Sequence, residues 1–122
     1  MLKKILIVDD EVDVVEALEA RLKANRYSVT MAESGREALI QAREVGPDLI
    51  ILDIMMPDMD GNEVARVLRD DKSTKDIPII FLTALQTKED EKRQGPEIGE
   101  NVVFAKPFEF DKLLKKIKEL IG

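Results

Sequence analysis

Residues 49–53, with the sequence LIILD, decide the fold of this chain. Four consecutive apolar residues need burial on both faces, which a central strand of a parallel sheet offers. Other apolar runs also end in polar residues: residues 5–8 precede Asp9-Asp10-Glu11, residues 79–82 precede Thr83, and residues 102–105 precede Lys106. If all these runs are parallel strands, the polar groups meet at one edge of the sheet. We therefore expect the functional site at that edge, with Asp53 at its centre.

Amphipathic segments separate these strands. In residues 12–25, four apolar side chains have helical spacing: Val12, Val15, Leu18 and Leu22. Further helices are predicted over residues 35–45, from Asp60-Gly61 onward, over residues 87–94 and over residues 108–121, and an edge strand over residues 27–32. Five βα units with right-handed crossovers predict an α/β fold with a doubly wound five-stranded parallel sheet in the order 2-1-3-4-5. A length of 122 residues suits a single domain, residues 1–122.

The composition excludes several classes of function. The chain has no Cys and no His, which removes zinc sites built on thiolate or imidazole and any Ser-His or Cys-His nucleophile pair. A net charge of -6 argues against direct nucleic-acid binding. No apolar run approaches the roughly 18 residues that span a membrane, and the first residues lead directly into a strand without a signal peptide. The expected location is cytoplasmic.

The predicted sheet edge carries carboxylates, a hydroxyl and an amine. Asp9, Asp10 and Asp53 would lie close together, and like charges this close need an offsetting charge. A divalent cation with oxygen ligands, Mg²⁺, would supply it. Lys106 would add a fixed positive charge that stabilises an incoming phosphoryl group, and Thr83 a hydroxyl. The Asp53 carboxylate can itself be the nucleophile and form an aspartyl-phosphate.

Each of these residues also has a purely structural interpretation. The acids at residues 9–11 would suit the N-terminus of the first helix, and residues 58–61 have the composition of a turn and a helix cap. Thr83 alone is typical of a strand end, and Lys106 alone of a solvated surface. The functional interpretation depends on the coincidence of four strand ends that carry Asp-Asp, Asp, Thr and Lys in that order.

Four short motifs contain these residues: VDDE at residues 8–11, DIMMPDMDG at residues 53–61, LTA at residues 82–84 and KPF at residues 106–108. With these motifs, the chain resembles the receiver domains of two-component response regulators over its whole length. The resemblance implies the CheY-like, flavodoxin-like fold that has the strand order 2-1-3-4-5. It also implies a phosphoacceptor switch rather than an enzyme. Asp53 would accept phosphate from a phosphohistidine of a sensor histidine kinase or phosphotransfer protein.

The resemblance further implies a role for each site residue. Asp10, Asp53 and the backbone carbonyl of Met55 would bind Mg²⁺, with Asp9 assisting through water. Thr83 and Lys106 would hold the phosphoryl group, and the Lys106-Pro107 bond would be cis. Phosphorylation would shift the face formed by the fourth helix, the fifth strand and the last helix, changing its affinity for a downstream output protein or domain. Many receivers form homodimers through that face.

Two features depart from the receiver pattern. Receivers usually have an aromatic switch residue three positions before the lysine, but here that position is Val103, and Phe104 follows it. Either the usual coupling between the threonine and the aromatic residue is replaced, or a local shift lets Phe104 act as the switch residue. The connection at residues 94–100 is also unusual.

Two other classes of protein fit the sequence less well. An aspartate-nucleophile phosphatase would carry Asp-x-Asp-x-Thr after the first strand, and a flavodoxin would have a phosphate cradle where this loop is acidic. The sequence leaves open a receiver that has lost phosphorylation, and whether the chain acts alone or belongs to a longer regulator.

Overall fold

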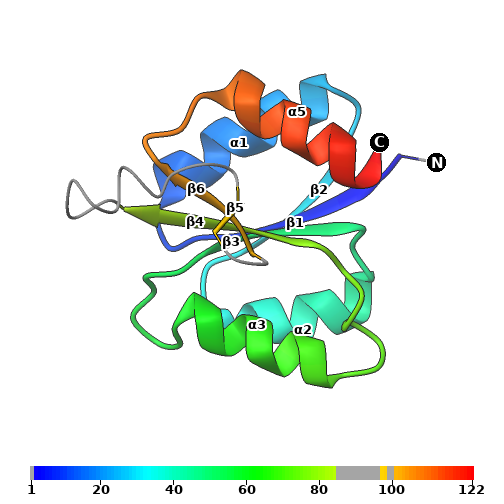
Figure 1. Cartoon of the computed structure of the whole chain (residues 1–122), viewed down its shortest axis with the longest axis vertical. Coiled ribbons are helices and arrows are strands. Elements are labelled where there is room, and N and C mark those ends of the chain that lie inside the picture. The colour runs from blue at the N-terminus through cyan, green and yellow to red at the C-terminus, as the bar shows by residue number, and fades with distance from the viewer. Residues whose placement is uncertain (1, 85–96, 99–100) are drawn as a thin grey trace.

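The computed structural model describes residues 2–84, 97–98 and 101–122, in which strands and helices alternate (Figure 1). Five strands are parallel: β1 (Lys4–Val8), β2 (Ser28–Ala32), β3 (Leu49–Asp53), β4 (Ile79–Ala84) and β6 (Asn101–Lys106). The described helices are α1 (Val12–Ala24), α2 (Gly35–Val45), α3 (Gly61–Asp70) and α5 (Phe110–Ile121). The helix predicted over residues 87–94 lies outside the described residues.

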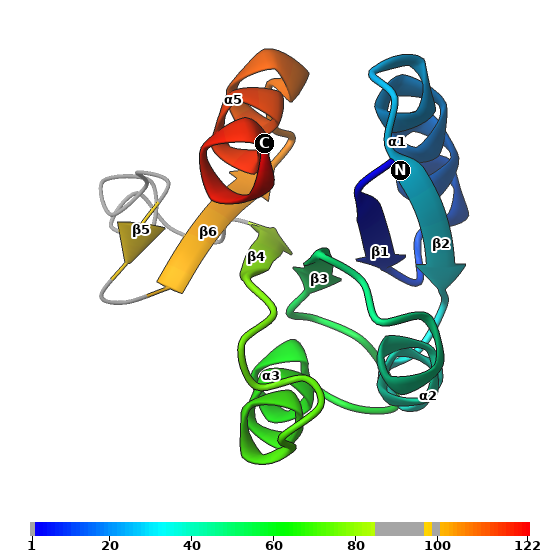
Figure 2. The same ribbon diagram turned by 90° about the vertical axis from the view of Figure 1, so that its right-hand side faces the viewer.

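The strands form one sheet in the order β2-β1-β3-β4-β6-β5, which Figure 2 shows with the strands side by side. Its five parallel strands have the predicted order 2-1-3-4-5, with β6 as the fifth, so the doubly wound fold is confirmed. The sequence did not predict β5 (Glu97–Ile98), which pairs antiparallel with β6 at the edge. Two residues are too few to show the alternation by which a strand is recognised.

Helices cover both faces of the sheet. Figure 1 shows α1 and α5 on one side and α2 and α3 on the other. All five residues of β3 are buried, as the run of apolar residues predicted. Side chains alternate across the strand, so Ile51 packs in the cluster under α1 and α5, whereas Leu52 packs in the cluster over α2 and α3. The sheet therefore has a hydrophobic core on each face.

Two details of the helices differ from the prediction. Val15, Leu18 and Leu22 are buried in α1, but the Val12 side chain is 52% exposed. Val12 is the first residue of α1, and the buried apolar residues of this helix begin at Val15. The last helix begins at Phe110 instead of residue 108, because β6 continues to Lys106 and a loop follows. Within the described part of the chain, no helix has the length and apolar character needed to cross a membrane.

Candidate functional site

The carboxyl ends of neighbouring strands bring three aspartates together. Strands β1 and β3 pair in register, with Val8 opposite Leu52, so the residues that follow them emerge side by side. Carboxylate oxygens of Asp9, Asp10 and Asp53 all lie within 4.8 Å of one another. Asp9 and Asp53 are buried, and Asp10 is exposed. Three acids in this space repel one another unless a cation is bound between them.

Lys106 completes this cluster from the end of β6. Its Nζ lies 2.8 Å from Asp9 Oδ2, 2.9 Å from Glu11 Oε1 and 3.6 Å from Asp53 Oδ2. The lysine side chain is only 13% exposed, so these contacts are poorly screened by solvent. The structure thus assembles four of the residues that the sequence singled out, Asp9, Asp10, Asp53 and Lys106. It adds Glu11, which sequence reasoning placed in the motif at residues 8–11 and at the start of the first helix but not among the site residues.

The pKa values of the cluster reflect this crowding. Burial, together with the charge of Asp9, raises the pKa of Asp53 to about 6, against the opposing effects of Lys106 and the Met55 amide. Burial lowers the pKa of Lys106, but its contacts with Asp9 and Glu11 and the charge of Asp53 outweigh this, and the net shift is upward. Lys106 therefore stays charged, and Asp53 is mostly ionised above pH 7.

Backbone amides fix two of the carboxylates. Asp9 Oδ1 accepts from the amide of Glu11 at 2.9 Å, and Asp53 Oδ1 accepts from the amide of Met55 at 3.3 Å. Within the described part of the chain, the buried Asp9 Oδ2 has its ion pair with Lys106 and no hydrogen-bond partner. A buried carboxylate oxygen in this state, within a set of oxygen donors, fits a hard divalent cation such as Mg²⁺. Glu11 is the N-cap residue of α1, but its side chain makes no capping hydrogen bond.

The loop after β3 has the turn and cap chemistry predicted for residues 58–61. Asp60 is the N-cap of α3 and accepts from the amide of Asn62 at 2.7 Å. Asp58 reaches the neighbouring helix and accepts from the amides at residues 35 and 36, at the start of α2. The amide of Gly61 donates to the carbonyl of Ile54 at 2.8 Å, which closes the loop beside Asp53.

Thr83 lies at the end of β4, opposite Ala105, and is partly exposed. Its hydroxyl donates to the carbonyl of Ala84 at 3.4 Å. The hydroxyl is therefore turned to the local backbone, and the structure does not hold it against the carboxylates. A side-chain rotamer of this kind leaves no signal in the spacing of residues.

The strand before Lys106 runs without a bulge. Its pairing with β4 is continuous, from Ile80 opposite Val102 to Ala84 opposite Lys106. Val103 packs with the cluster on the α2 and α3 face, and Phe104 with the cluster on the α1 and α5 face. The hypothesis that a local shift lets Phe104 take the place of Val103 is therefore wrong, because successive strand residues point to opposite faces of the sheet. The Lys106-Pro107 peptide bond is cis, as the resemblance implied.

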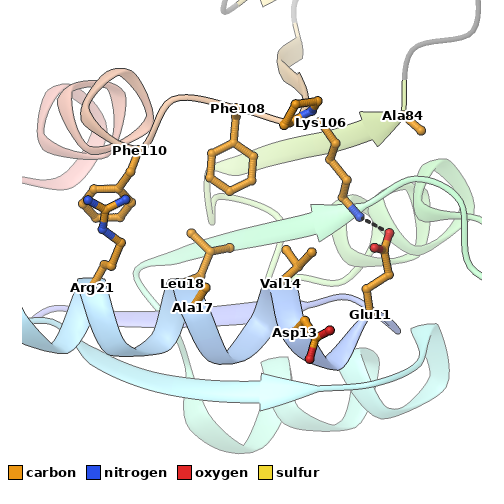
Figure 3. A pocket seen from close by; sticks show the side chains of 11 residues that line it. Glu11, Asp13, Val14, Ala17, Leu18, Arg21, Ala84, Lys106, Phe108 and Phe110 are labelled. Atoms are coloured by element: carbon orange, nitrogen blue, oxygen red, sulfur yellow. Dashed lines mark hydrogen bonds and ion pairs between the residues drawn. The ribbon is translucent and has the colours of Figure 1, made fainter.

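A groove of about 630 Å³ lies beside Lys106, between α1 and the connection from β6 to α5 (Figure 3). Phe108 and Phe110 line it from one side, and Val14 and Leu18 from the other. The Arg21 guanidinium lies 4.5 Å from the centroid of the Phe110 ring, within the range of a cation–π interaction. The groove gives the acidic cluster an apolar flank that the sequence reasoning did not predict.

Comparisons with known proteins agree with this geometry. The family model described as the response regulator receiver domain matches residues 5–118. The chain belongs to the response regulator receiver domain family. It is 42% identical to the response regulator PleD of Caulobacter vibrioides, with 98% of this chain and 26% of PleD covered. It is 40% identical to the transcriptional regulatory protein PhoP of Bacillus subtilis, with 99% of this chain and 49% of PhoP covered.

This receiver domain therefore spans about a quarter to a half of the length of these curated relatives. A solved structure of the response regulator TrrA from Thermotoga maritima, in complex with Mg²⁺ and BeF, has a TM-score of 0.80 and 39% identity, covering 98% of this chain and 99% of that one. A putative response regulator from Chloroflexus aurantiacus has a TM-score of 0.85 and 37% identity, covering 99% of this chain and 98% of that one. The family consists of phosphoacceptor signalling modules of two-component systems, not of conventional enzymes.

Proposed function

We propose that Asp53 is the phosphoacceptor of this receiver domain. The observation that supports this is its place at the buried end of the central strand, with Asp53 Oδ2 3.6 Å from Lys106 Nζ and other carboxylates around it. An ionised oxygen of Asp53 attacks the phosphorus of the donor and forms an O–P bond. The P–N bond of a phosphohistidine breaks, and its electron pair stays on the imidazole, which takes up a proton. Lys106 offsets the negative charge of the transferred group.

Asp9, Asp10 and Asp53, with the backbone carbonyl of Met55, are the groups that would hold Mg²⁺. When bound, this ion supplies positive charge that neutralises the carboxylates and the phosphoryl oxygens. The chain's own residues orient the site, since the amides of Glu11 and Met55 fix Asp9 and Asp53. The Thr83 hydroxyl would donate a hydrogen bond to the phosphoryl oxygens in place of its hydrogen bond to the Ala84 carbonyl.

The donor imidazole has to come from a partner, because the chain contains no His. A sensor histidine kinase or a phosphotransfer protein fits this requirement. We further propose a single cytoplasmic receiver domain over residues 1–122 that acts on a downstream output protein or domain. Its output face would be built by the fourth helix, β6 and α5, and would also support a homodimer. Hydrolysis of its own aspartyl-phosphate would reset the switch.

Incubation with Mg²⁺ and acetyl phosphate, followed by intact-mass measurement, tests the proposal. The wild type is expected to gain one phosphoryl group that mild base removes. Asp53→Asn should gain none, and chelation of Mg²⁺ with EDTA should prevent labelling of the wild type. Asp13→Asn, which removes an exposed carboxylate from the first turn of α1, is the matched control and should be labelled like the wild type. Labelling of the Asp53→Asn variant would show that the acceptor is another residue.

A further inference from the structure

Lys106 divides its charge among three carboxylates, and Asp53 is the most distant of them. The ammonium lies 2.8 Å from Asp9, 2.9 Å from Glu11 and 3.6 Å from Asp53. Lysine offers only three N–H donors. The ammonium therefore lies closer to Asp9 and Glu11 than to the residue that receives the phosphoryl group.

Glu11 differs from the two aspartates that contact Lys106. Its side chain is 60% exposed, whereas those of Asp9 and Asp53 are buried. It does not belong to the acidic cluster whose oxygens can share a cation. The side chain makes no capping bond to α1, and it reaches Lys106 across the mouth of the groove (Figure 3). Its contact with Lys106 is thus the one that a bound anion can displace without disturbing the residues that hold Mg²⁺.

We infer that Glu11 is a positioning residue that competes with the phosphoryl group for Lys106. This inference rests on the proposed function of Asp53. In the unmodified state Glu11 holds the ammonium at 2.9 Å, and in the modified state the phosphoryl oxygens take its place. The phosphoryl group gains Lys106 only by breaking the Glu11 ion pair. Glu11 therefore opposes phosphorylation and favours the unmodified state.

Binding of beryllofluoride in saturating Mg²⁺ tests this competition without covalent chemistry. The dissociation constant is measured for the wild type, Glu11→Gln and Glu11→Asp. The shorter side chain of the Glu11→Asp variant keeps the charge but moves the carboxylate back by one methylene, so the contact with Lys106 is lost. Both variants are expected to bind beryllofluoride roughly threefold to fivefold more tightly than the wild type, which is the upper part of the range for partly exposed ion pairs.

Asp13→Asn is the matched control for charge. Asp13 lines the same groove as Glu11, and Figure 3 shows its carboxylate turned away from Lys106. This variant should bind beryllofluoride like the wild type. Equal affinity of the wild type and both Glu11 variants would overturn the inference. So would an equal gain in Asp13→Asn, or a gain in Glu11→Gln with none in Glu11→Asp, since each would point to net charge instead of the contact.

The Lys106 ammonium provides a second readout that a merely structural role of Glu11 would not move. Its ¹⁵Nζ resonance, without beryllofluoride, should shift in both Glu11 variants and stay in place in Asp13→Asn. After saturation with beryllofluoride, the Lys106 resonances of all four proteins should converge, because Glu11 no longer contacts the ammonium. Thermal midpoints establish that each variant is folded. If the wild type neither gains a phosphoryl group nor binds beryllofluoride, the proposed function fails as well, whereas failure of the inference alone leaves wild-type labelling intact.

Discussion

At the scale of single residues, Asp53 is held in an environment that resists its negative charge. It is buried at the end of β3, beside a second buried carboxylate, and its pKa is about 6. Such a site makes ionised Asp53 costly in the absence of a cation and reactive toward an electrophile. The fold maintains this arrangement because the surrounding hydrophobic cores, not the acidic cluster, supply its stability.

The raised pKa of Asp53 makes stability depend on pH. The folded pKa lies above the ordinary value of 3.8, so the folded state binds a proton more tightly than the unfolded chain. Well below pH 3.8, Asp53 is neutral in both states and imposes no cost, and the cost of ionising it develops as the pH rises from about 4 to above 6. In EDTA, Asp53→Asn should therefore be more stable than the wild type by roughly 2 to 3 kcal/mol at pH 7.5, with most of this difference lost near pH 4.

Urea denaturation of both proteins across this pH range measures the effect. Asp76→Asn, which removes an exposed carboxylate, is the control and should change stability by less than about 0.5 kcal/mol. A difference between Asp53→Asn and the wild type that stays constant from pH 4 to pH 8 would contradict the raised pKa.

At the scale of elements, the connection from β3 to α3 sets the position of Asp53. The two segments approach so closely at Gly61 that a Cβ there would lie 2.4 Å from the carbonyl oxygen of Asp53 and 2.7 Å from Cα of Ile54. Both atoms belong to the backbone and cannot rotate away. Glycine at this position is therefore a requirement of packing, and the end of β3 cannot be separated from the start of α3 without moving Asp53.

The Gly61→Ala substitution should consequently destabilise the domain and displace Asp53. We expect a loss of roughly 2 kcal/mol or more in the free energy of unfolding, as in overpacked cores, together with slower labelling by acetyl phosphate. Asn62→Ala, one residue further on an exposed position of α3, should leave both quantities close to those of the wild type. Denaturation and intact-mass time courses check the pair, and a stable Gly61→Ala variant with normal labelling would refute the packing argument.

The ends of the strands and helices around the site show which features the sequence predicts and which it does not. Apolar runs and topology rules were enough to place Asp9, Asp53 and Lys106 at one edge, because the carboxyl ends of parallel strands meet there. The exposure of Val12 and the rotamer of Thr83 were not predictable, since both depend on three-dimensional contacts that spacing along the sequence does not fix. The contact of Glu11 with Lys106 was hidden because it depends on the conformations of two long side chains, which topology rules do not give.

At the scale of the whole molecule, a single sheet carries two separate hydrophobic cores. One cluster joins the sheet to α1 and α5, and the other joins it to α2 and α3. The apolar side chains of β3 alternate between the two clusters, so this strand belongs to both cores. The acidic edge is held between the two layers, and a change on either face should reach it through the sheet.

This arrangement predicts that the two cores unfold together. Ile51→Ala removes side-chain atoms from the α1 and α5 face, and Leu52→Ala from the α2 and α3 face. Each should lower the free energy of unfolding by roughly 2 to 5 kcal/mol, and each should keep one cooperative transition, because both cores share β3. Far-ultraviolet circular dichroism reports the helices on both faces, and the fluorescence of Tyr27, buried in the α1 and α5 cluster, reports one face. Coincident transitions from both probes in both variants fit a single unit, whereas a Leu52→Ala transition seen by circular dichroism before Tyr27 fluorescence changes would show that the cores separate.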